Sequence, residues 1–349
     1  MTDTDLIPAI PDIADAALAA RLQAALDNKT KPVGALGRLE ALALRIGTIL
    51  GTEQPVLDAP QMLVCAGDHG LAARGVSAYP SDVTWQMVEN FLAGGAAVSV
   101  LARQHGLALT VVDCGVRRDF QPRPGLVSRR IAAGTADASA GPAMTSEQCA
   151  QAIANGREVV RALPGNALLL GEMGIGNSSS AALLLSRLAG LDIGLCTGAG
   201  TGLDADGLAR KREVLREVLA LHAGATAPLE ALAAFGGFEV ATLVGAVLQA
   251  AKERRVIVVD GFSASAAVLV AQAIRPQVTQ RCVAAHSSAE PGHTLLLKHL
   301  GLEPLLNLDL RLGEGSGGAL AWPLLESACR ILSEMASFES AGVSKQDKP

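Results

Sequence analysis

The sequence predicts an α/β protein, with a doubly wound, Rossmann-like parallel sheet and a small helical domain built from both termini. Short apolar segments recur along the middle of the chain, and most of them are continuous rather than alternating. That pattern is typical of strands buried on both faces of a parallel sheet. Helical segments separate the apolar runs, and regular alternation of strand and helix favours right-handed crossover connections.

Each expected element follows from its local pattern. Apolar runs predict strands at residues 62–66, 108–112, 167–170, 193–196, 256–259, 282–285 and 305–308. The intervening segments predict helices at residues 83–105, 146–163, 178–189, 206–222, 230–252 and 263–273. Near the ends, two helices are expected within residues 12–50 and another from Ala319 to about Ser337.

The domain boundaries follow from this order of elements. We expect residues 1–56 and 314–338 to pack together as the small helical domain, and residues 57–313 to form the Rossmann-like large domain. Residues 339–349 are polar, and we expect them to be a disordered tail.

Composition excludes several classes of protein. The chain of 349 residues has a net charge of −5 and 3% aromatic residues, which argues against nucleic-acid binding. No uncharged apolar run reaches the length of a membrane span, and the acidic N-terminus lacks the apolar core of a secretory signal. Six cysteines lie far apart without a CxxC pair, so we expect a reduced cytoplasmic protein with buried free thiols.

Glycines and polar side chains gather just after the predicted strands. Residues 67–70, 113–115, 171–180, 260–263 and 286–293 all follow such a strand. In doubly wound folds ligands bind beyond the carboxyl ends of the strands, so we expect the functional site at this edge.

One of these segments, Gly174-Ile175-Gly176-Asn177-Ser178, predicts a phosphate site because it follows a strand and opens a helix. The turn at residues 197–202 is expected to hold the same phosphate from the other side, with Lys211 adding positive charge. The alternative, for either segment, is a tight turn that binds no ligand. The first turn also resembles a dinucleotide fingerprint, but Ser179 replaces its third glycine, which weakens the alternative of a dinucleotide-dependent oxidoreductase.

Glu314 is a candidate general base, because it follows a strand-like run and lies between glycines that allow a ligand to approach. A solvated acid or a helix N-terminal acid is the alternative. Asp260-Gly261 resembles the metal-binding motif of common phosphoribosyltransferases but lacks its second acid, so Asp260 is expected to bind a ribose hydroxyl or to orient the loop. His69, His286 and His293 lack metal-ligand spacing. We expect no metal and no cofactor.

Eight segments, in order between about residues 30 and 330, form a wider pattern. They are 67–70, 75–88, 94–97, 171–180, 235–239, 260–262, 286–293 and 311–319. Together they closely resemble the nicotinate-nucleotide–dimethylbenzimidazole phosphoribosyltransferase family. Asp137 departs from the family pattern, in which an asparagine is expected at that position.

The resemblance implies transfer of phosphoribose from nicotinate mononucleotide to 5,6-dimethylbenzimidazole, by a cytoplasmic homodimer. Glu314 matches the catalytic base, and Glu172 is the second catalytic candidate, near the ribose. The residues expected to line the base pocket are Ser77, Tyr79, Gln86, Leu312 and Gly313. Those expected near the phosphate and ribose are Gly174, Gly176, Asn177, Ser178, Gly200, Gly202, Lys211, Asp260 and Ser288.

The implied chemistry agrees with these residue types. A pyridinium leaves as a neutral base and needs no metal, whereas the attacking benzimidazole must lose a proton, which Glu314 can accept. Removal from water should raise the pKa of Glu314. The preferred acceptor base stays open, and so does the alternative of a non-catalytic nucleotide-binding module.

Overall fold

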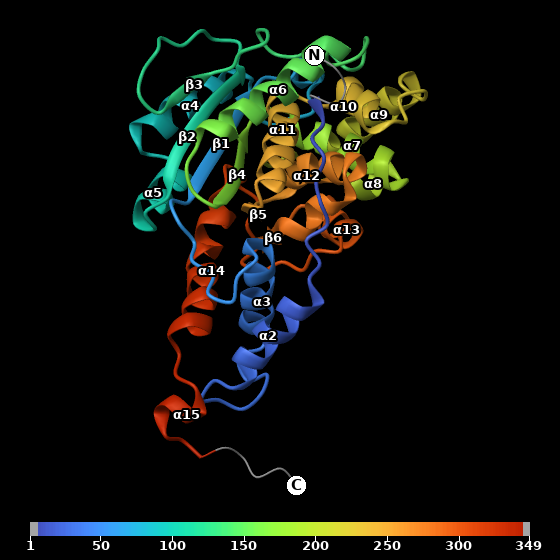
Figure 1. Ribbon diagram of the computed structural model, residues 1–349. Coiled ribbons are helices and arrows are strands. Elements are labelled where there is room, and N and C mark those ends of the chain that lie inside the picture. The colour runs from blue at the N-terminus through green and yellow to red at the C-terminus, as the bar shows by residue number, and fades with distance from the viewer. Residues whose placement is uncertain (1–5, 345–349) are drawn as a thin grey trace.

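A six-stranded parallel sheet forms the centre of the molecule in the computed structural model, which describes residues 6–344 (Figure 1). Its strands lie in the order β3-β2-β1-β4-β5-β6, and every neighbouring pair is parallel. Their bounds are β1 Gln61–Gly67, β2 Ala108–Gly115, β3 Leu126–Ser128, β4 Ala167–Met173, β5 Val256–Val259 and β6 Cys282–Ala284. The predicted doubly wound α/β fold is therefore confirmed.

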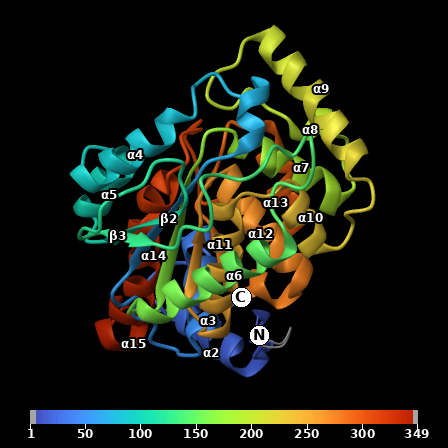
Figure 2. The same cartoon turned by 90° about the horizontal axis from the view of Figure 1, so that it is seen from above.

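Helices cover both faces of the sheet. The helices, including the 3-10 segments η1 and η2, are α2 Ala16–Asp27, α3 Arg38–Leu50, η1 Gly70–Arg74, α4 Asp82–Ala93, α5 Ala97–Gln104, α6 Ser146–Ala162, α7 Asn177–Ala189, α8 Ile193–Cys196, α9 Ala205–Leu221, α10 Pro228–Phe235, α11 Phe238–Lys252, α12 Phe262–Ile274, η2 Pro276–Arg281, α13 Pro291–Leu300, α14 Ser316–Glu334 and α15 Phe338–Ala341. Seen from above, α4 and α5 lie on one side of the strands, and α6, α11 and α12 lie on the other (Figure 2).

Successive side chains of β1 point to opposite faces of the sheet. Leu63 and Cys65 join the apolar cluster formed with α6, α7, α11 and α12, whereas Met62 and Val64 join the cluster formed with α3, α4, α5 and α14. Both clusters are buried, which explains why the strand reads as a continuous apolar run. All six cysteines are buried with free thiols, as the sequence predicted.

Several predicted elements differ from the structure. Residues 193–196 form the one-turn helix α8, not a strand, because Asp192 caps its N-terminus by accepting from the Gly194 N–H at 2.8 Å. An apolar run of four residues does not distinguish strand from helix. Of the strand predicted at residues 305–308, only Leu306–Asn307 is a strand in the structure, β8. It pairs with β7, His286–Ser287, outside the main sheet.

Glycines divide two of the predicted helices. Residues 83–105 form α4 and α5, separated at Gly94, whose φ of 80° lies in the left-handed region. Residues 230–252 form α10 and α11, separated at Gly236 and Gly237. The short edge strand β3 was not predicted. Residues 339–341 belong to α15, against the expected disorder there, and the tail at 345–349 lies outside the described residues.

The helices from the two chain ends pack together, with α14 in contact with α3 and α3 in contact with α2 (Figure 1). Lys29 pairs with Ser337 in an isolated bridge, and its Nζ donates to the Met335 carbonyl at 2.6 Å. Their apolar side chains are continuous with one face of the sheet. The division into two domains therefore stays a prediction. No helix within residues 6–344 is both long and apolar enough to span a bilayer.

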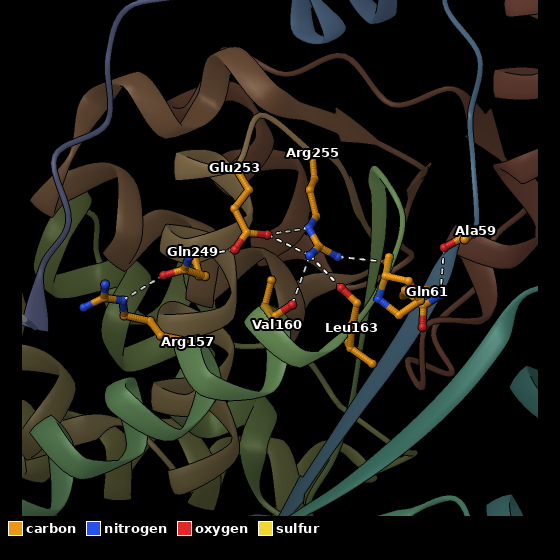
Figure 3. Close-up of polar contacts among 9 residues, drawn as sticks. Ala59, Gln61, Arg157, Val160, Leu163, Gln249, Glu253 and Arg255 are labelled. Atoms are coloured by element: carbon orange, nitrogen blue, oxygen red, sulfur yellow. Dashed lines mark hydrogen bonds and ion pairs between the residues drawn. The ribbon is translucent and has the colours of Figure 1, made fainter.

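Arg255 closes the opposite, amino edge of the sheet, just before β5 (Figure 3). Its guanidinium donates to the carbonyls of Val160 at 3.0 Å, Leu163 at 2.7 Å and Pro164 at 3.0 Å, and pairs with Glu253 at 2.7 Å. Val160 lies in the last turn of α6, where carbonyls lack helical partners. One buried cation thus fixes the C-terminus of α6 against the sheet.

The strand order also locates the site. The chain continues outward from β1 through β2 to β3, and then returns through α6 to β4 on the other side of β1. The order of the strands reverses between β1 and β4, and such a point is where open α/β sheets bind ligands, beyond the carboxyl ends of the strands.

Candidate active site

A cleft lies at this carboxyl edge, beyond β4 and β5. Its walls come from the turn after β4, the loop before α9, and the segments that follow β5, β6 and β8. The predicted residues that line it are Ser77, Glu172, Gly174, Gly176, Asn177, Ser178, Gly200, Ser288, Leu312 and Gly313. The structure therefore brings together, from distant segments, most of the residues that the sequence singled out.

The other predicted residues do not line the cleft. Tyr79, at 53% exposed, and Gln86 face solvent, so the predicted base pocket is only partly assembled. Gly202 is exposed as well. Lys211, Asp260 and Glu314 are buried, and each contacts or adjoins a residue of the lining.

The turn after β4 has the geometry of an anion site. Gly176 has a φ of 98° and stands at the N-terminus of α7, which no side chain caps. A Cβ at Gly174 would lie 2.4 Å from the Gly67 carbonyl, so glycine allows the turn to pass close to the end of β1. An uncapped helix N-terminus attracts an anion.

Lys211 supplies positive charge behind this turn. From α9, its Nζ donates to Ser178 Oγ at 2.9 Å and to the Gly198 carbonyl at 3.2 Å, so it joins the two predicted phosphate turns. The side chain is 1% exposed. Burial lowers the pKa of Lys211 to about 8, although the charge of Glu290 opposes that shift.

Glu172 lies at the end of β4, where its carboxylate contacts the Asn177 amide. Burial raises the pKa of Glu172 to about 8, helped by the negative charges of Asp260 and Glu239. A Cβ at Gly313 would lie 2.4 Å from Glu172 Oε1, so glycine at 313 lets the Glu314 loop pass this carboxylate without displacing it.

Glu314 lies behind the cleft at 5% exposed, and its Oε2 has no hydrogen-bond partner. Burial raises the pKa of Glu314 to about 7, the Val98 N–H of α5 lowers it, and the charge of Asp260 raises it. The expected desolvation shift is thus confirmed. Its φ is 67°, and the glycines on both sides also have positive φ, so this carboxyl stands in a left-handed turn.

Asp260 follows β5 and faces that turn from behind. Its Oδ2 accepts from the Gly315 N–H and its Oδ1 from the Gly318 N–H, both at 3.0 Å. His286 Nε2 lies 3.3 Å from the same Oδ1. These contacts occupy both oxygens of Asp260, which the sequence placed near the ribose.

Sequence reasoning missed three residues that line the cleft, His286, Glu290 and Arg311. His286 and Glu290 follow β6, and the sequence signal was present, because the run 286–293 was noted as polar at a strand end. Glu290 is 9% exposed, and its Oε2 has no hydrogen-bond partner. Arg311 donates to the Gly200 carbonyl at 3.3 Å, which links two walls of the cleft.

The other two histidines that the sequence offered as metal ligands make protein contacts. His69 pairs with the buried Glu239 at 2.6 Å, and His293 contacts Ser265 at 3.0 Å while accepting from the Ser288 N–H at 2.9 Å. Across residues 6–344, histidine, cysteine and acidic side chains do not converge in threes as a metal site requires. Asp137 lies outside the cleft lining, where it pairs with Arg74 at 2.7 Å.

Comparison with known proteins gives one consistent family. A phosphoribosyltransferase family model matches residues 12–343. The nicotinate-nucleotide–dimethylbenzimidazole phosphoribosyltransferase of Variovorax paradoxus is 87% identical over 99% of this chain and 100% of its own length. An enzyme of that name from Cupriavidus necator is 60% identical, over 95% of this chain and 96% of its own.

Among solved structures, the crystal structure of CobT from Thermus thermophilus matches with a TM-score of 0.92 at 43% identity. The match covers 94% of this chain and 99% of that chain. Sequence identity, chain coverage and fold agree with the resemblance drawn from the motifs. The chain therefore belongs to the nicotinate-nucleotide–dimethylbenzimidazole phosphoribosyltransferase family.

Proposed function

We propose that this protein transfers 5-phosphoribose from nicotinate mononucleotide to 5,6-dimethylbenzimidazole. The products are α-ribazole 5′-phosphate and nicotinate, and the first of these supplies the lower ligand of cobalamin. The observation that most supports this reaction is the cleft itself. It is lined both by the proposed anion-binding turn, with Lys211 bound to Ser178 behind it, and by the buried carboxyl of Glu172. The names of the 87% and 60% identical relatives support the same reaction.

The phosphate of the donor is assigned to the first turn of α7, with Lys211 as its counter-ion. When the bond between C1′ and the pyridinium nitrogen breaks, nicotinate leaves with a neutral ring nitrogen, and positive charge develops on the ribose. Glu172 lies in the cleft, where its ionised form would stabilise that charge. Its pKa is about 8, and positive charge developing on the ribose would lower that pKa and favour the ionised form. Leu312 and Gly313 supply the wall against which the flat acceptor base would lie.

The role of general base goes to Glu314. As a ring nitrogen of the benzimidazole bonds to C1′, the other ring nitrogen becomes acidic and gives its proton to a carboxylate. A base works best when its pKa lies near the working pH, and the pKa of Glu314 is about 7. In the structure this carboxyl is behind the lining, so the proposal requires it to turn into the cleft when substrates bind.

Purified protein with both substrates, in the presence of a chelator and without added metal, tests the function. Chromatography should separate α-ribazole phosphate and free nicotinate. Glu314→Gln should bind both substrates and lose most turnover, whereas the exposed Glu217→Gln serves as a matched control and should retain it. Wild-type protein that binds the donor without forming product would instead support a non-catalytic nucleotide-binding module.

We also infer that the protein works in the cytoplasm as a homodimer. The support is the family resemblance and the six buried free thiols, which suit a reducing compartment. Light scattering of the purified protein at working concentration measures the assembly state, and a monomer under assay conditions would exclude the dimer. Fractionation of cells that express the tagged chain measures the compartment.

A further inference from the structure

The helix that follows Glu314 begins without a cap of its own. Gly315 is the N-cap of α14 and has no side chain, so the first N–H groups of a 19-residue helix would lack acceptors. Asp260, just after β5, supplies these acceptors, because its two oxygens accept from the Gly315 and Gly318 N–H groups. This is the bonding of a helix cap, provided by a residue more than fifty positions earlier in the chain.

His286 completes the arrangement on the other side of Asp260. Its Nε2 lies 3.3 Å from Asp260 Oδ1, and both side chains are almost fully buried, at 2% and 1% exposed. A Cβ at Gly317 would lie 2.0 Å from His286 Cδ2 and 2.8 Å from Asp260 Oδ1. Glycine at 317 therefore lets the histidine and the carboxylate reach the start of α14.

The turn that this pair holds is strained. Gly313, Glu314 and Gly315 have φ values of 80°, 67° and 95°, and of the three only Glu314 carries a side chain, for which a left-handed conformation is unfavourable. Such a conformation persists only where surrounding contacts fix it. The contacts from Asp260 to Gly315 and Gly318 lie directly next to Glu314 and supply that restraint.

We propose that Asp260 and His286 are a positioning pair, which holds the turn carrying Glu314 and whose opposite charges balance beside that base. The proposal rests on the proposed function, because it concerns how the base of that reaction is placed. Neither residue needs to touch the reacting atoms for this role. Asp260 acts through the backbone of α14, and His286 acts through Asp260.

The electrostatics support the geometry. Burial lowers the pKa of His286, but the hydrogen bond and charge of Asp260 outweigh it and leave that pKa raised. His293, whose ring centre lies 6.0 Å away, has its pKa lowered to about 4 by burial and by the charge of His286, so it stays neutral. The titratable groups that interact with the pair are Glu172 at the end of β4, His293 on α13 and Glu314 before α14. Glu290, before α13, lines the same cleft as His286.

The two variants Asp260→Asn and His286→Gln test the proposal, since they should affect kcat and its pH profile differently. Asparagine removes the negative charge and, by lowering the pKa of His286, removes its positive partner as well, so the pH midpoint for ionising Glu314 should move little. It also offers one acceptor to two N–H donors, so kcat should drop by roughly 10- to 100-fold. Glutamine keeps a donor to Asp260 but cannot carry a charge, so the midpoint should rise, by roughly one pH unit.

The measurement is kcat against pH with both substrates saturating, so that titration of Lys211 affects the Michaelis constant of the donor. Glu172, with a pKa of about 8, titrates in the same range, so each variant is also compared in the Glu172→Gln background, where the remaining midpoint belongs to Glu314. Asp309→Asn is the matched control. It removes an exposed carboxyl from the same loop and should change neither kcat nor the midpoint. If Asp260→Asn does not fold, the upward shift of His286→Gln decides alone.

Folded variants with wild-type kcat and an unmoved midpoint would overturn the pair. A purely structural role would lower stability and leave the pH profile in place, which also counts against it. Failure of the proposed function has a different signature, namely no product from wild-type protein at any pH. In that case an NMR titration of the His286 ring still tests the pair, because Asp260→Asn should lower its pKa and an unchanged value would refute the coupling.

Discussion

Gly313 permits a sharp test of the contact between the Glu314 loop and Glu172. Gly313→Ala places a methyl group 2.4 Å from Glu172 Oε1, at a residue with φ of 80°. Gly34→Ala is a matched control, because Gly34 has φ of 75° and no atom within 4 Å of the added Cβ. Both variants carry the conformational cost, and only the first carries the collision.

The magnitudes follow from these two terms. A left-handed alanine should cost each variant about 1–2 kcal/mol of the free energy of unfolding. At residue 313 the obstacle is the end of a flexible side chain, so Glu172 can retreat by roughly 1 Å to reach ordinary van der Waals contact. A misplacement of about 1 Å at a reacting centre can lower turnover by about 100-fold.

Urea denaturation and steady-state kinetics measure the two effects separately. We expect similar losses of stability in both variants and a loss of kcat in Gly313→Ala only. Two results would refute the reasoning. Wild-type kcat in Gly313→Ala would mean that the position of Glu172 is not critical, and equal loss of kcat in Gly34→Ala would mean that the collision is not the cause.

Three further predictions concern single residues. Lys211→Met should raise the Michaelis constant for nicotinate mononucleotide by roughly 100-fold with a smaller change in kcat, because it removes the positive charge behind Ser178 that we propose as the counter-ion of the phosphate; initial rates over a range of donor concentrations measure this. Burial raises the pKa of Glu172 from 4.5 to about 8, so folded protein keeps a proton that unfolded protein releases. The free energy of unfolding should therefore fall as pH rises through that window, and urea titrations should find this slope reduced in Glu172→Gln. Arg255→Met should lower the free energy of unfolding by about 3 kcal/mol, because three carbonyls and Glu253 lose a buried cation. The exposed Arg330→Met should change that free energy by less than about 0.5 kcal/mol in the same titration.

Periodicity predicted most of the sheet because β1, β2, β4, β5 and β6 are apolar over most of their lengths and buried on both faces. Periodicity failed where the apolar run was short, as at residues 193–196, where the side chain of Asp192 caps a helical turn instead. Glycine placement predicted the anion-binding turn and singled out Glu314 and Lys211 as candidates. Motif resemblance then proposed their roles, because the local patterns also allowed a solvated acid and a turn without a ligand.

Contacts between distant segments were beyond prediction. The sequence offered two roles for Asp260, and only its hydrogen bonds to Gly315 and Gly318 favour orientation of the loop. His286 and Glu290 were noted as polar, but their position in the cleft depends on how the segment after β6 turns back toward α14. Such relations arise from tertiary packing, which residue spacing does not encode.

The pairing of the two chain ends has a consequence for how the protein is made. On the ribosome, β1 and the N-terminal helices appear early, yet the apolar face that they share is covered by α14, near the end of the chain. That face stays open to water and to other chains until the last helix has been synthesised. We therefore expect nascent chains that stall before residue 316 to need a chaperone, and the native core to close only once α14 has left the ribosome.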